Sequence, residues 1–241
     1  MSVNRFEIMP LLICAAPEAL MPESVSGRSL ALIVDIREHW TTEKAFTAAQ
    51  SILDRRHSEN AAGLGLLRIA IPDDDIGQDA IGRLAALRPD GFVLSGCGGV
   101  ADIQRFDVML RVAEAENGIE PGSIAIVAEV GRRLGFFLAE QSLQGVSDRL
   151  KAIVFDGAEL VHATASQAAN GPAGRAGAPL LFARAATILK AGQADLFCYH
   201  LLPEEHVSDD DIRTLRDISL ADGFSGVIVR NIAQLAMLAA S

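Results

Sequence analysis

The sequence is poor in basic residues, in cysteine and in long apolar runs. Its 21 Lys and Arg are outnumbered by 31 Asp and Glu, which gives a formal net charge of −10, and the basic residues form no cluster. A nucleic-acid partner is therefore not expected, because nucleic acids are bound by basic patches. A mild acidic excess mainly favours solubility.

No stretch approaches the roughly 18 to 20 unbroken apolar residues of a membrane span, so no membrane association is expected. The apolar run 10–17 is too short and too weakly flanked for a signal peptide, and we interpret it as the first strand. Three cysteines, Cys14, Cys97 and Cys198, are an odd number without CxxC spacing. Reduced thiols and a cytoplasmic location are therefore the expectation.

Alternating strand-like and helix-like runs are the main pattern of the chain, in which 50% of the 241 residues are hydrophobic. We count eight of each kind. The expected strands lie near 10–14, 30–35, 64–70, 91–95, 124–129, 151–155, 195–199 and 226–230, and the helices near 17–26, 41–57, 76–88, 100–117, 132–142, 179–192, 208–222 and 231–240. This pattern predicts an α/β fold, a single TIM (β/α)8 barrel over residues 1–241. An open doubly wound sheet is the alternative.

Two expected strands that are successive along the chain end in acidic residues. The apolar run 123–131 contains Glu129, and the run 151–155 is followed by Asp156 and Glu159. A carboxylate in a buried strand is costly unless it is paired or binds a metal. If the two strands are neighbours, their ends lie about 5 Å apart, which suits joint ligation of a hard divalent cation.

Further polar residues lie within or directly after the other expected strands, toward the end where TIM barrels carry their active sites. These residues are Asp35, Arg37, Glu38, His39, Arg68, the Gly-rich run 95–99, His200, Arg230 and Asn231. The connection 165–177 is long and rich in Gly and Ala, so it is the candidate for a mobile loop over the site.

In their order along nearly the whole chain, these stretches resemble the citrate lyase beta-subunit-like and HpcH/HpaI aldolase superfamily. The stretch 34–39 resembles an acidic turn of the family, and Arg68 lies in a stretch similar to its Val-Arg-Val strand. Glu129 matches the Ile-Glu-Thr stretch that carries one metal-binding glutamate. Glu159 falls on the aspartate that is the second metal ligand, with Asp156 as a competing candidate.

The resemblance implies a magnesium-dependent lyase, with Mn²⁺ as the other metal, that makes or breaks a carbon–carbon bond. Its substrates would be 2-oxo acids or acyl-CoA thioesters, and it would form a homo-oligomer, a trimer or hexamer. Ser95-Gly96 and Arg230-Asn231 depart from the Pro-Lys and His-Pro pairs of the family. These departures leave a thioester hydrolase or a non-catalytic oligomeric partner as alternative functions. An exposed apolar patch at Leu235 and Leu238 is expected to favour association.

Within this interpretation Glu129 and Glu159 are the expected metal ligands. Arg68 is expected to bind the developing oxyanion or the substrate carboxylate. His39 is the expected general base, because its ordinary pKa suits neutral pH.

Four more residues complete the expected site. Asp35 and Glu38 would position His39 or a metal-bound water. Gly96 and Gly98 would contribute backbone N–H groups that cradle an anion of the substrate.

Structural roles remain open for the same residues. Glu129 and Arg68 could form a purely structural ion pair. Glu159 could serve the start of a helix, and His39 could be a surface or capping residue. Cys97 has no convincing His partner that would make it a nucleophile.

Overall fold

The computed structural model describes residues 11–15, 31–58, 63–72, 75–164, 177–204 and 208–239. The helix expected near 17–26 lies outside these ranges, as does the expected mobile loop apart from Gly177. For the first strand, only the backbone is described.

Eight strands alternate with helices along the chain. They are β1 (Leu11–Ala15), β2 (Ala31–Asp35), β3 (Gly65–Ala70), β4 (Gly91–Ser95), β5 (Ala125–Val130), β6 (Leu150–Asp156), β7 (Phe197–Leu201) and β8 (Gly226–Val229). All neighbouring strands are parallel, and they form a closed barrel in sequence order. The ring closes where Leu11 of β1 lies opposite Val227 of β8. The predicted TIM barrel is confirmed, and the closure excludes an open sheet.

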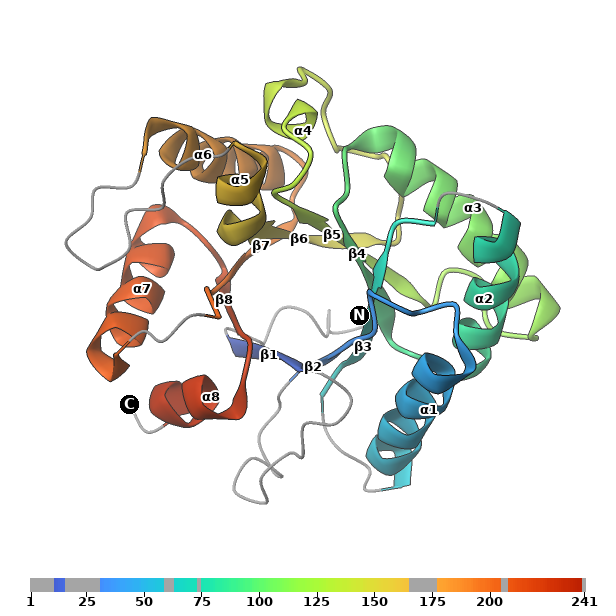
Figure 1. Ribbon diagram of the computed structural model, residues 1–241. Helices are drawn as coiled ribbons and strands as arrows, with labels where there is room; N and C mark the ends of the chain where they lie inside the picture. The colour runs from blue at the N-terminus through green and yellow to red at the C-terminus, as the bar shows by residue number, and fades with distance from the viewer. Residues whose placement is uncertain are drawn as a thin grey trace.

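The helices surround the strands, as Figure 1 shows in a view along the barrel axis. They are α1 (Glu43–Ser58), α2 (Asp75–Ala86), α3 (Val100–Glu116), α4 (Gly135–Leu138), α5 (Gly157–Ala163), α6 (Ala178–Gln193), α7 (Asp209–Asp222) and α8 (Ile232–Ala239). The helix predicted near 132–142 is wrong in length, because only four residues are helical there. The expected helices did not include α5, a short helix that directly follows β6, although a helix start at Glu159 was an open alternative.

The barrel separates two apolar layers, because side chains alternate in direction along each strand. The inner layer contains Ile33, Leu66, Val127, Val154 and Ile228, among others. A larger layer lies between the strands and the helices.

The α8 helix contributes its apolar face to that outer layer. Leu235 is 1% exposed and Leu238 is 6% exposed. The expected exposed patch at these residues is therefore wrong, because an amphipathic helix on a barrel turns its apolar side toward the sheet.

Other expectations from composition can be checked on the structure. Among the described residues, no helix is long and apolar enough to cross a membrane. Cys97 and Cys198 are free thiols and both are buried. Burial raises the pKa of each of these thiols to about 12, which makes both poor nucleophiles.

Candidate active site

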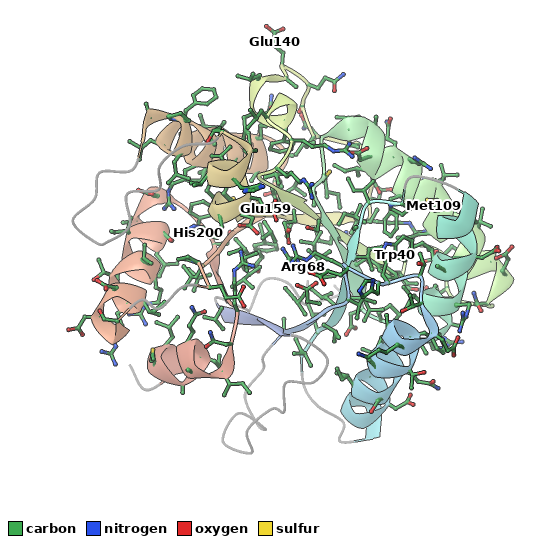
Figure 2. All side chains as sticks on the ribbon, viewed as in Figure 1. Trp40, Arg68, Met109, Glu140, Glu159 and His200 are labelled. Atoms are coloured by element: carbon green, nitrogen blue, oxygen red, sulfur yellow. The ribbon has the colours of Figure 1, made fainter. Side chains whose placement is uncertain are left out.

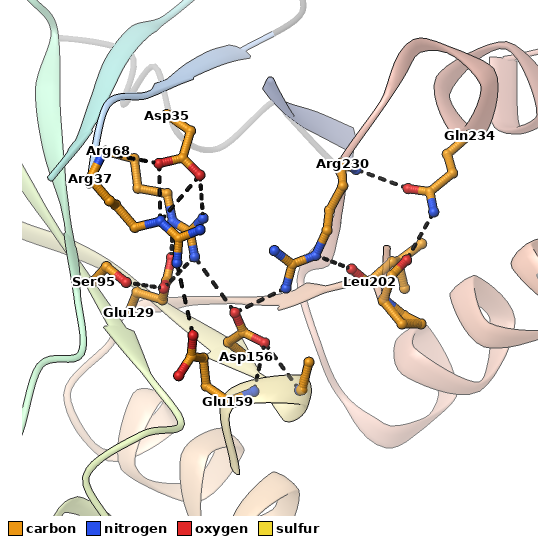
Figure 3. Close-up of polar contacts among 12 residues, drawn as sticks. Asp35, Arg37, Arg68, Ser95, Glu129, Asp156, Glu159, Leu202, Arg230 and Gln234 are labelled. Carbon is orange, nitrogen blue, oxygen red and sulfur yellow. Dashed lines mark hydrogen bonds and ion pairs between the residues drawn. The ribbon is translucent and has the colours of Figure 1, made fainter. Parts of the chain in front are cut away.

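The inward-facing positions become polar at the C-terminal ends of the strands. The residues two positions beyond Ile33, Leu66, Val93, Val127, Val154 and Ile228 are Asp35, Arg68, Ser95, Glu129, Asp156 and Arg230. Because strand side chains alternate, these six residues come from six strands or strand ends and face the same space. Figure 3 shows them converging. This end of a TIM barrel is where active sites are built.

Arg68 is the centre of this polar layer, and Figure 2 shows it in the middle of the ring of strands. Its Nε and Nη2 donate to Oε2 and Oε1 of Glu129 at 2.6 and 2.5 Å. Its Nη1 donates to Oδ2 of Asp35 at 2.7 Å. The side chains of Arg68 and Glu129 are 1% and 2% exposed. The buried Arg68 therefore fixes the orientation of the Glu129 and Asp35 carboxylates.

Glu129 has a further partner on the neighbouring strand. The hydroxyl of Ser95 donates to its Oε1 at 2.6 Å, and the two residues are opposite each other in the β4–β5 register. Oε1 thus accepts two hydrogen bonds, whereas Oε2 accepts one from the described residues, donated by Arg68. A carboxylate oxygen has two lone pairs, so Oε2 keeps acceptor capacity.

Asp35 connects the buried Arg68–Glu129 pair to Arg37, which lines the cavity. It accepts hydrogen bonds from Nε of Arg37 at 3.0 and 3.1 Å. Burial raises the pKa of Asp35, but the positive charges of Arg68 and Arg37 outweigh this effect and hold the pKa below its ordinary value. Asp35 therefore stays ionised at neutral pH.

Asp156 is fully engaged by its surroundings. Its Oδ1 accepts the backbone N–H groups of Ala158 and Glu159 and so caps the start of α5. Its Oδ2 accepts from Nη2 of Arg230 at 2.9 Å and lies 3.5 Å from Nη2 of Arg68. Arg230 is itself fixed, because its Nε donates to the carbonyl of Leu202.

Glu159 is held much more loosely. It lies in the first turn of α5 and its side chain is 32% exposed. Among the described residues its ion-pair partner is Arg37, whose Nη1 lies 4.0 Å from Oε1. Of the carboxylates of Asp35, Glu129, Asp156 and Glu159, that of Glu159 is therefore the one that can most easily turn toward a ligand.

A cavity of about 330 Å³ opens above the polar layer, at the lower end of the size range of ligand pockets. It is lined by Arg37, Glu38, Ala70, Ser95, Gly96, Glu129, Val130, Gly131, Arg132, Asp156 and Glu159. Together with the groups behind the lining, the region holds five carboxylates (Asp35, Glu38, Glu129, Asp156, Glu159) and four guanidinium groups (Arg37, Arg68, Arg132, Arg230). Its formal charge is −1.

The structure brings together most of the site residues expected from the sequence. Glu38, Gly96, Glu129 and Glu159 line the cavity. Asp35 and Arg68 lie directly behind the lining and contact it through ion pairs.

Two expected residues lie elsewhere. His39 is exposed and does not line the cavity, and its carbonyl accepts from Thr42 before α1. Gly98 lies beside the small hollow next to α4, and its N–H donates to Asp102. That N–H group already has an acceptor within the chain, so the expected anion cradle does not extend to Gly98.

Several residues of the site received no role from the sequence. Ser95, Arg37 and Arg230 were visible only as polar residues at strand ends, and Arg132 carried no signal. For Ser95 and Arg230 the period of two along each strand was the available signal, because it aligns them with the inner apolar residues. His200 is buried on the opposite face of β7, where its Nδ1 lies 2.8 Å from the hydroxyl of Ser219, so it is not part of the site.

The donors around the cavity fit a small divalent cation. Among the described residues no group of three or more His, Cys, Asp and Glu forms a metal cluster. Mg²⁺ however needs only one or two protein carboxylates, with waters and substrate completing its shell. Glu159 and Oε2 of Glu129 have acceptor capacity and line the same cavity. Asp156 also lines it, but its Oδ1 accepts two backbone hydrogen bonds, and its Oδ2 accepts from Arg230 and lies 3.5 Å from Nη2 of Arg68. The arrangement therefore favours Glu159 over Asp156 as the second ligand.

A scan against protein-family models and a search of curated proteins found no match. Among solved structures, the chain is similar to the malate synthase of Haloferax volcanii in complex with magnesium and glyoxylate, with a TM-score of 0.75, 15% identity, and 96% of this chain and 74% of that chain covered. It is also similar to a citrate lyase from Burkholderia xenovorans (TM-score 0.73, 14% identity, 95% and 76% covered). A third similar structure is an HpcH/HpaI aldolase from Desulfitobacterium hafniense (TM-score 0.63, 13% identity, 95% and 90% covered). The resemblance expected from the sequence is confirmed in these neighbours, and at such identities it concerns the fold.

Proposed function

We propose that this chain is a carbon–carbon lyase of the aldolase and citrate lyase type. It would cleave or form a bond beside a carbonyl in a small 2-oxo acid or an acyl-CoA thioester, through an enolate. The observation that carries this proposal is the cavity at the C-terminal end of the barrel, lined by Glu129 of β5 and by Glu159 in the first turn of α5, which follows the adjacent strand β6. The malate synthase of similar fold supports it, since that protein is described with magnesium and with glyoxylate, a small 2-oxo acid.

The negative formal charge of the site is the reason why the proposed mechanism includes a metal ion. With a formal charge of −1, the residues alone would repel an acidic substrate. We propose that Glu129 and Glu159 hold Mg²⁺ or Mn²⁺, which would polarise the substrate carbonyl as a Lewis acid.

Arg68 acts in this proposal as a positioning residue. It does not line the cavity, but its two hydrogen bonds hold the Glu129 carboxylate in one direction, and the Ser95 hydroxyl adds a third. A site fixed in this way needs little reorganisation when charge develops on the substrate. Arg37 lines the cavity and is the nearer candidate for direct contact with the substrate carboxylate.

Glu38 is our candidate for the base that takes the substrate hydroxyl proton. It lines the cavity and has no ion pair within the described part of the chain, whereas His39 lies outside the cavity lining. A carboxylate can act as a general base once the substrate hydroxyl lies within hydrogen-bond distance.

Calorimetric titration of Mg²⁺ or Mn²⁺, with and without oxalate as a mimic of enolpyruvate, tests the proposal. We expect oxalate to strengthen metal binding in the wild type, and Glu159→Gln to weaken that binding at least tenfold. Asp156→Asn serves as the comparison and should have the smaller effect on metal affinity, because its oxygens are already engaged. A folded wild-type protein that binds no metal contradicts the lyase proposal.

The result also decides the main alternative. The Arg68–Glu129 pair is what a barrel with a purely structural ion pair would show, so it favours a non-catalytic partner if no metal binds. A thioester hydrolase would retain the metal and would be recognised from its products. Assembly as a homo-oligomer stays a prediction, to be measured by sedimentation.

A further inference from the structure

Two consecutive arginines follow β5, and they differ in their surroundings. Arg133 forms an ion pair with Asp102 at 3.3 Å and does not line the cavity. Arg132 lines the cavity, is exposed, and has no carboxylate within ion-pair distance in the described ranges. One of two neighbouring cations is thus neutralised by the protein, and the other faces the place where a ligand would bind.

Each of the other arginines of the site has at least one protein carboxylate as an ion-pair partner, and this includes Arg37, the candidate for contact with the first substrate carboxylate. Arg37 is paired with Asp35, Arg68 with Glu129 and Asp35, and Arg230 with Asp156. Among the arginines on the cavity wall, Arg132 is therefore the one whose positive charge is not balanced by a carboxylate of the described residues. A planar guanidinium at such a position suits a carboxylate, which it can bind through two parallel hydrogen bonds.

We infer that Arg132 is a specificity-determining residue that binds a second anionic group of the substrate, away from the reacting carbonyl. The substrate class would be 2-oxo acids with a second carboxylate rather than 2-oxo acids with an apolar tail. This inference rests on the proposed function, because it places the 2-oxo end of the substrate at Glu129 and Glu159.

The test compares two acids that differ at one end only, 2-oxoglutarate and 2-oxopentanoate, in calorimetric titrations at saturating Mg²⁺. We expect the wild type to bind 2-oxoglutarate about three- to tenfold more tightly, the range for a charge pair that is partly shielded from water. Arg132→Met should abolish this preference while leaving 2-oxopentanoate binding unchanged, and Arg132→Lys should retain part of it.

Arg133→Met is the matched control, since it removes the same charge from the adjacent position. An equal loss of preference in Arg133→Met and Arg132→Met would show a general effect of surface charge and would overturn the inference. Equal binding of both acids by the wild type would overturn it as well, with the proposed function left standing. If neither acid binds to the wild type, the inference and the proposed 2-oxo acid site both fail.

Discussion

Arg68 and Glu129 form a bidentate ion pair across the inside of the barrel, from β3 to β5, with N–O distances of 2.6 and 2.5 Å. Both side chains are almost completely buried, at 1% and 2% exposure. β4 lies between these two strands, and the hydroxyl of its Ser95 donates a further hydrogen bond to the Glu129 carboxylate. The charges of the candidate site are therefore held in place by the barrel itself, before any ligand binds.

Removal of one partner of this pair should destabilise the protein strongly. We expect Arg68→Met to lower the free energy of unfolding by about 3–5 kcal/mol, because it leaves the Glu129 charge buried without its partner. Urea unfolding followed by circular dichroism measures the change. The exposed pair of Arg213 and Asp210 offers the control, and Arg213→Met should cost less than about 1 kcal/mol.

A double variant separates the pair from the packing around it. Arg68→Met combined with Glu129→Met should be more stable than Arg68→Met alone, since no buried charge then lacks a partner. A single variant as stable as the wild type would contradict the structural importance of this pair.

Gly131 is required by the close approach of β5 to the end of β6. A Cβ atom at this position would lie 2.2 Å from the carbonyl oxygen of Asp156 and 3.2 Å from the Cβ of Glu159. Gly131→Ala should therefore lower the free energy of unfolding by about 1–3 kcal/mol, because the backbone has to shift. It should also weaken metal binding, because the shift moves the residues that line the cavity.

The comparison for this variant is Gly135→Ala at the start of α4, where a Cβ would have no atom within 4 Å. This change should leave thermal stability and metal affinity within error of the wild type. Equal effects at the two glycines would show that the close contact at Gly131 is not the cause.

His200 should make the stability of the protein depend on pH. Burial, together with the positive charges of Arg184 and Arg230, lowers the pKa of His200 to about 3, from an ordinary value of 6.5. The unfolded chain therefore binds this proton as the pH falls below 6.5 while the folded chain does not. Stability should be complete above that pH and decrease progressively as the pH falls toward 3.

The measurement is the free energy of unfolding in urea between pH 7 and about pH 5, above the range in which carboxylates dominate. His200→Gln should flatten the dependence on pH in this interval, whatever its effect on absolute stability. His162→Gln removes an exposed histidine and should leave the slope unchanged. A slope in His200→Gln equal to that of the wild type would contradict a neutral, buried imidazole.

The strands and most helices could be predicted from the sequence because their signals are local. Runs of apolar residues bounded by turn residues lie within a few positions of every observed strand, and Ser208 with Asp211 forms a capping box at the start of α7. The short helices α4 and α5 were harder to predict from the sequence. The segment after β5 is apolar enough for a longer helix than α4, and α5 depends on the cap that Asp156 provides.

The site was only partly predictable for a similar reason. Glu129 and Glu159 stand out because a carboxylate beside an apolar strand is unusual. The displacement of His39 from the cavity is not visible in the sequence, since it depends on the course of the backbone after β2. The direction of a loop side chain is set by tertiary contacts, whereas that of a strand side chain is set by its position in the alternation.

The sequence alone determined the number of strand–helix units, the alternation of inward and outward side chains, and hence the set of polar residues at the strand ends. The tertiary structure decided which of these charges neutralise each other. Arg68 is 61 positions from Glu129, and Asp156 is 74 positions from Arg230. Ion pairing depends on distance in space and on burial, and only closure of the barrel brings these groups together. It also leaves Glu159 and Arg132 without close ion pairs in the described structure, and our functional proposals rest on these two side chains.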